Sequence, residues 1–71
     1  MDPGRGLIGL VRQLVDHLTA AKTRLAVLRR RLRRGEVDLA EVEVHLAQVE
    51  RQLDDAVAAT EEIKRALELT A

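Results

Sequence analysis

The sequence predicts an all-α fold, an antiparallel two-helix hairpin that resembles a coiled coil. Three observations predict it: a heptad-like spacing of apolar residues in each half, a single glycine between the halves, and opposite charge on the two halves. Residues 1–34 contain nine Lys or Arg and two acids, whereas residues 36–71 contain ten acids and three bases. A net charge of +7 therefore precedes one of −7, which favours a chain that folds back on itself.

The first helix is predicted over about residues 3–34. Its apolar residues are separated alternately by four and three positions, the spacing of a helix seam. This row consists of Leu7, Val11, Leu14, Leu18, Ala21, Leu25, Leu28 and Leu32. Asp2 followed by Pro3 is a signal for the start of a helix. The arginines near its end suit the negative end of the helix dipole.

Gly35 marks the turn, because glycine readily adopts the left-handed conformation that ends many helices. Asp38 is the candidate cap of a second helix, predicted over about residues 37–69. The apolar row of this helix consists of Leu39, Val42, Leu46, Val49, Leu53, Ala56, Thr60, Ile63 and Leu67. A connection this short makes the helices antiparallel neighbours, so residues 1–71 are predicted to form one hairpin domain.

The hairpin is predicted to dimerise into a four-helix bundle. A core this small, without disulfides or aromatic residues, normally needs a further stabiliser. Near the turn the predicted seam is flanked by opposite charges, with Arg29 facing Glu43 and Lys22 facing Glu50. Toward the termini the apolar stripe widens beyond what one neighbouring helix covers. The predicted dimer interface consists of Ile8, Leu10, Val15, Val57, Ala59 and Ala66.

A dense run of arginines precedes the turn and forms a candidate patch for an anionic partner. Its members are Arg29, Arg30, Arg31, Arg33 and Arg34. Acids after Gly35 and the helix dipole account for part of this charge, but the run covers several faces of the helix. Positive potential is therefore expected at the turn, where nucleic acid or an acidic protein would bind. The absence of aromatic residues removes the usual stacking platform for single-stranded bases.

The composition argues against catalysis, because the chain has no Ser, Cys or Tyr to act as a nucleophile. His17 and His45 are expected roughly 12 Å apart along the hairpin at a rise of ~1.5 Å per residue, too far to share a metal ion. We therefore predict a protein that is not an enzyme and that has no metal site.

No cofactor and no membrane segment are predicted. Residues 4–9, G-R-G-L-I-G, match the letters of a dinucleotide-binding fingerprint, but that motif needs a preceding strand to aim its helix at a pyrophosphate. No apolar run is longer than four residues, the length of the run at 25–28, whereas a membrane span needs about 20. We therefore expect a cytoplasmic protein.

Much of the chain resembles the dimerisation and phosphoacceptor domain of histidine kinases. Residues 18–28, L-T-A-A-K-T-R-L-A-V-L, are similar to its first helix, and residues 49–53, V-E-R-Q-L, to its second. The resemblance spans roughly residues 10–67 and implies a homodimeric four-helix bundle in a signalling system. Arg12, Gln13 and His17 stand where that family has its histidine, acid and proline, so the resemblance implies no catalytic residue.

These features predict a small dimeric interaction module without enzymatic activity, which binds itself and a protein partner in signal transduction. An alternative is a nucleic-acid-binding hairpin dimer that uses its Arg-rich turn. A third hypothesis is a phosphotransfer protein in which His17 carries the phosphoryl group.

Overall fold

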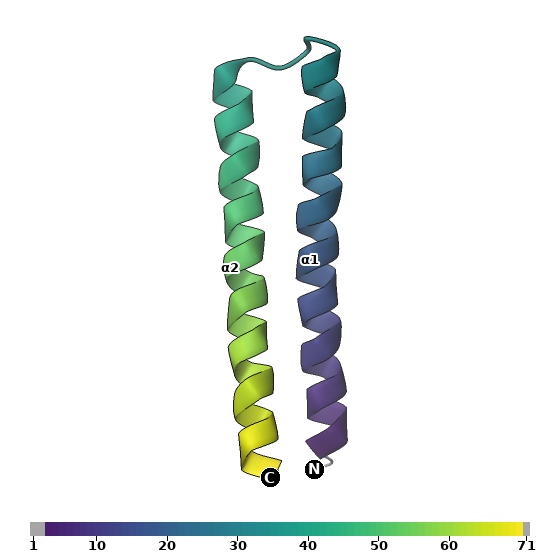
Figure 1. The fold of residues 1–71 in the computed structure, drawn as a ribbon, viewed down its shortest axis with the longest axis vertical. Helices are drawn as coiled ribbons and strands as arrows, with labels where there is room; N and C mark the ends of the chain where they lie inside the picture. The colour runs from purple at the N-terminus through teal and green to yellow at the C-terminus, as the bar shows by residue number, and fades with distance from the viewer. Residues whose placement is uncertain (1–2, 71) are drawn as a thin grey trace.

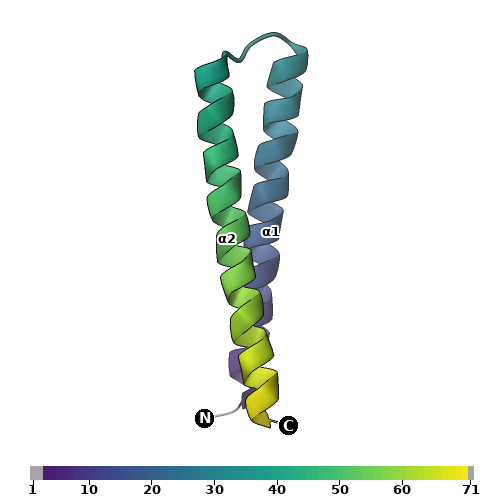
Figure 2. The same cartoon turned by 60° about the vertical axis from the view of Figure 1, so that its left-hand side comes forward.

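The chain folds as a long helical hairpin in the computed structural model (Figure 1). The structure describes the backbone of residues 3–70 and the side chains of residues 6–69. Helix α1 spans Pro3–Arg33 and helix α2 spans Leu39–Thr70. They lie antiparallel in a rod of 51 × 15 × 14 Å and cross at a shallow angle (Figure 2). The predicted all-α hairpin is confirmed, whereas the predicted cap Asp2 lies outside the described residues.

Gly35 ends α1 in the left-handed conformation, with φ of +69°. The Gly35 N–H donates to the Leu32 carbonyl at 3.1 Å, and the Glu36 N–H donates to the Arg31 carbonyl at 3.0 Å. This pair of bonds is a Schellman motif, which satisfies carbonyls that the last turn of a helix would otherwise leave open. The glycine therefore stops the helix as its position predicts.

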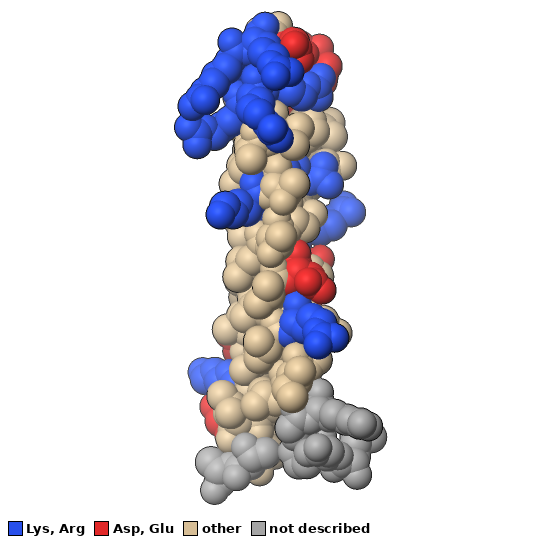
Figure 3. All heavy atoms as spheres, turned by 90° about the vertical axis from the view of Figure 1, so that its right-hand side faces the viewer, with Lys and Arg blue, Asp and Glu red and all other residues tan. Residues whose placement is uncertain are grey.

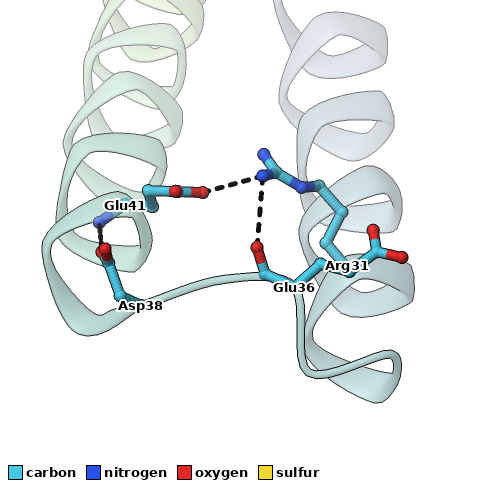
Figure 4. Close-up of polar contacts among 4 residues, drawn as sticks. All are labelled: Arg31, Glu36, Asp38 and Glu41. Carbon is cyan, nitrogen blue, oxygen red and sulfur yellow. Dashed lines mark hydrogen bonds and ion pairs between the residues drawn. The ribbon is translucent and has the colours of Figure 1, made fainter.

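Asp38 caps the start of α2, as predicted. Its Oδ1 accepts a hydrogen bond from the Glu41 N–H at 2.9 Å, which satisfies one of the free amide groups of the first turn. The Glu41 side chain reaches across the turn instead, where its Oε2 lies 2.8 Å from Nη2 of Arg31 (Figure 4). Arg31 also donates a longer bond of 3.4 Å to the Glu36 carbonyl. One arginine thus ties both helices and the turn together.

The seam between the helices is narrow and built largely of small residues. Five apolar residues are buried, each at most 6% exposed: Ala21, Leu28, Val49, Ala56 and Ala59. Half-buried residues continue the seam at Leu7, Leu10, Leu14, His17, Arg24 and Arg31 of α1 and at Val42, His45, Gln52, Ile63 and Ala66 of α2. Three of the five buried residues are alanines, so little apolar area leaves water per residue.

The predicted seam is half wrong. Its members Leu7, Leu14, Ala21 and Leu28 do face α2, but the alternating members Val11, Leu18, Leu25 and Leu32 are 41–48% exposed. The same holds in α2, where Leu39, Leu46, Leu53, Thr60 and Leu67 are exposed. The apolar stripe is wider than one neighbouring helix can cover. Within the hairpin, each helix covers only the more polar edge of the other helix's stripe, where Arg31 pairs with Glu41.

Candidate interaction surface

One side of the seam is a polar edge, which we define by Arg24, Arg31, Glu41 and Gln48. Arg24 donates from Nη1 to Oε1 of Gln48, and Arg31 pairs with Glu41. Among the described side chains this is the single ion pair. The predicted pairs Arg29–Glu43 and Lys22–Glu50 do not form within the hairpin.

The exposed leucine rows of both helices lie on the other side of the seam. In α1, Arg24 follows the buried Ala21 by three positions, whereas Leu25 follows it by four. At about 100° per residue these two positions lie on opposite sides of Ala21. In α2, Gln48 precedes the buried Val49, whereas Leu53 follows it by four, so they too are separated by the seam. Because the hydrogen bond joins Arg24 to Gln48, Leu25 and Leu53 share the opposite side.

This side carries most of the exposed apolar area of the molecule. Thirteen large apolar side chains are more than 40% exposed. All but Val44 and Leu69 lie on this side, which we call the apolar face. Its members are Ile8, Val11, Val15, Leu18, Leu25, Leu32, Leu39, Leu46, Leu53, Val57 and Leu67. A large continuous patch of exposed apolar side chains typically marks an interaction site, whereas scattered exposed apolar residues do not.

Thr60 stands within this face without adding a polar cost. It is the one polar residue of the α2 leucine row, and its Oγ1 donates to the Ala56 carbonyl at 2.8 Å. Because the hydroxyl hydrogen is already bonded within its own helix, the residue can be covered by another apolar surface without leaving an unpaired donor.

The predicted dimer interface divides between the two sides. Ile8, Val15 and Val57 are 62%, 52% and 61% exposed and lie at the outer margin of the apolar face. Ala59 is only 6% exposed, and Leu10 and Ala66 are half-buried. These last three follow buried or seam positions by three residues, which places them in the seam beside the polar edge. The leucine rows, which the sequence assigned to the seam, stand in their place on the apolar face.

The arginine patch keeps four of its five predicted members at the surface. Arg31 is committed to Glu41, whereas Arg29, Arg30, Arg33 and Arg34 are exposed and form no ion pair with any described residue. A shallow hollow is lined by Ala26, Arg29, Arg30 and Arg33. Figure 3 shows Lys and Arg side chains gathered at the turn end of α1, above a mostly uncharged surface. We call Arg29, Arg30, Arg33 and Arg34 the arginine tip.

Both histidines lie half-buried in the seam. Three side-chain atoms in the seam are buried and have no hydrogen-bond partner: Nδ1 of His45, Oε1 of Gln52 and Nε of Arg24. Among the described residues no group of three His, Cys, Asp or Glu side chains is placed to hold a metal ion. The hypothesis that His17 accepts a phosphoryl group stays a prediction.

Comparison with known proteins supplies no further constraint. No family model, curated protein or solved structure matches this chain. Within the described part of the chain, neither helix has a stretch apolar enough to cross a bilayer.

Proposed function

We propose that this chain is a small interaction module, without enzymatic activity, that associates with a second copy of itself to form a four-helix bundle. The observation that carries the proposal is the apolar face. Its leucines keep the heptad-like spacing of a packed seam, yet they are 41–86% exposed in the single hairpin. A second hairpin would cover them with an identical set of rows.

The weakness of the intramolecular seam supports the same proposal. Two large apolar residues, Leu28 and Val49, are buried, against thirteen that are more than 40% exposed. Three covered polar atoms in the seam also lack partners, and each such atom costs about 1–3 kcal/mol. A hairpin with so thin a core gains most of its stabilisation from what it packs against.

The solvent-accessible surface area of the chain also supports a missing contact. The chain exposes 5749 Å², whereas a compact monomer of 7.9 kDa exposes about 4,400 Å². The excess of about 1,300 Å² exceeds the ~800 Å² that each partner contributes to a standard interface. One copy therefore has enough uncovered surface for a stable dimer.

The setting we propose is a cytoplasmic signalling system, in which the bundle holds two copies of a partner or a larger chain together. The resemblance of residues 18–28 and 49–53 to a kinase dimerisation hairpin supports this setting. The absence of a nucleophilic Ser, Cys or Tyr supports a binding role over a chemical one.

Substitution on the apolar face tests the proposal. Leu18→Gln with Leu53→Gln is expected to weaken dimerisation about a hundredfold or more, because four leucines per dimer lose their apolar burial. Sedimentation equilibrium measures the dissociation constant. Interference optics suit this chain, since it has no aromatic residue to absorb near-ultraviolet light.

Val44→Gln is the matched control. Val44 is 56% exposed on α2 but lies off the apolar face, so this variant should dimerise like the parent chain. Equal dissociation constants for the leucine variant and the Val44 variant would contradict the proposal. Circular dichroism shows whether each variant stays helical.

The arginine tip favours a second candidate function, binding of nucleic acid by the dimer. The observation behind it is that four arginines at one end of the rod have no acidic partner among the described residues. Such a surface binds phosphates with an affinity that falls steeply as salt rises.

Neutralising the tip tests this candidate. Arg30→Gln, Arg33→Gln and Arg34→Gln together are expected to abolish RNA and DNA binding at low salt while the helical signal is retained. Arg12→Gln with Arg51→Gln, remote from the turn, should bind like the parent chain. Absence of any binding by the parent chain in low-salt filter assays would exclude this function.

A further inference from the structure

We propose that the second copy docks with its α1 on the α2 of the first, and that both turns lie at the same end of the bundle. This inference rests on the proposed dimer and adds its geometry. Two symmetric arrangements bring the apolar faces together. A twofold axis along the bundle pairs α1 with the partner's α2 and keeps the turns together; an axis across it pairs like helices and separates the turns.

The polar edge sets the heights of residues along the hairpin. Arg24 bonds Gln48 and Arg31 bonds Glu41, so residues whose numbers add to 72 lie at the same level. An axis along the bundle preserves these levels between chains. Each residue of α1 then faces, across the dimer, the residue of α2 that lies at its own height.

The residues at the outer margin of the apolar face match under this rule. Lys22 lies level with Glu50, Arg29 with Glu43, and Val15 with Val57. Each directly follows a seam residue in the sequence, so all lie on the side that carries the leucine rows. Within one hairpin Lys22 and Arg29 form no ion pair with the described residues, which leaves both available to the acids of a second copy.

The leucine rows match to within one residue of this register. The pairs Leu32–Leu39, Leu25–Leu46 and Leu18–Leu53 have numbers that add to 71, so each of these layers would pair leucines across chains. A fourth layer pairs Val11 with Thr60, whose hydroxyl is already bonded to Ala56. In these four layers each row residue therefore has an apolar or satisfied neighbour, whereas Ile8, at the margin, lies level with Lys64.

The alternative arrangement matches poorly at the margin of the apolar face. With the turns at opposite ends, α1 faces its own reversed copy, which sets Lys22 near Val15 and Arg29 near Ile8 of the partner. Glu50 then lies near Val57. Shared turns do place both arginine tips at one end, but Arg30, Arg33 and Arg34 lie off the apolar face, and salt screens charges beyond about 8 Å. Contacts at the interface decide the geometry.

The separation of two spin labels tests the geometry. With Ala40→Cys labelled near the turn, shared ends predict an interchain distance of about 30 Å, from helix spacings of 8–10 Å plus the labels. Opposite ends predict about 45 Å, because the labels then lie ~40 Å apart along the axis. Thr19→Cys, near mid-height, is the control, since both arrangements give it a similar short distance.

The outcomes separate the geometry from the dimer itself. A short distance at both sites supports the proposal. A long distance at residue 40 with a short one at residue 19 overturns the geometry and leaves the dimer intact. No interchain coupling at either site overturns the dimer as well.

A charge exchange gives a second, independent measurement. Lys22→Glu with Arg29→Glu, and Glu43→Lys with Glu50→Lys, should each weaken homodimerisation about tenfold or more, because like charges would then face each other at four places. A one-to-one mixture of the two variants should recover the parent affinity as a heterodimer. Failure of the mixture to recover contradicts ion pairing between chains.

Discussion

At the scale of single residues, three side chains and one glycine define the turn. Gly35 supplies the left-handed backbone, Asp38 caps α2, and Arg31 bonds to Glu41. Each was visible in the sequence as a residue type at a helix boundary. The sequence does not show that Glu41 is the partner of Arg31. Asp38 is nearer to Arg31 in the sequence, but its carboxylate accepts a hydrogen bond from the backbone of α2.

Gly35→Ala is expected to lower the free energy of unfolding by about 1–2 kcal/mol, the cost of placing an alanine in the left-handed region. Beyond Gly35 itself and its two chain neighbours, no atom lies within 4 Å of the position that the new Cβ would occupy, so a steric clash with the rest of the molecule does not contribute. Urea denaturation followed by circular dichroism measures the change. Gly35→Asn should lose less, since asparagine tolerates this conformation, and an alanine variant as stable as the parent chain would refute this role.

At the scale of elements, the sequence predicts the two helices well and their facing sides less well. Helix bounds depend on local signals. Helix α1 ends within two residues of Gly35, and α2 begins directly after Asp38. The facing sides depend on which rows of a wide apolar stripe a neighbour covers. A heptad-like count identified the row of Leu18 and Leu25 as seam because that row is the more apolar.

The structure instead turns the row of His17, Arg24 and Arg31 toward the other helix. Bonds from Arg24 to Gln48 and from Arg31 to Glu41 hold that edge, and the aliphatic stems of the arginines cover part of the seam. A sequence pattern records how apolar a row is, but it does not record whether one helix or two will cover it. A second hairpin would cover the leucines that are exposed in the single hairpin.

At the scale of the whole molecule, the separation of charge has two consequences. Within the chain it gives one ion pair at the turn and leaves four arginines exposed. Between chains, the proposed geometry uses Lys22 and Arg29 against Glu50 and Glu43. In that proposed geometry, the charges that first suggest a hairpin closed on itself would become contacts between two copies, and the two arginine tips would form one cationic end.

The mass in solution tests the central claim most directly. Size-exclusion chromatography with light scattering and refractive-index detection, at tens of micromolar protein, should give about twice the chain mass of 7.9 kDa. The proposed dimer predicts this result, because a second copy would bury the exposed leucines of the apolar face. A helical, stable species with the mass of a single chain at that concentration would contradict it.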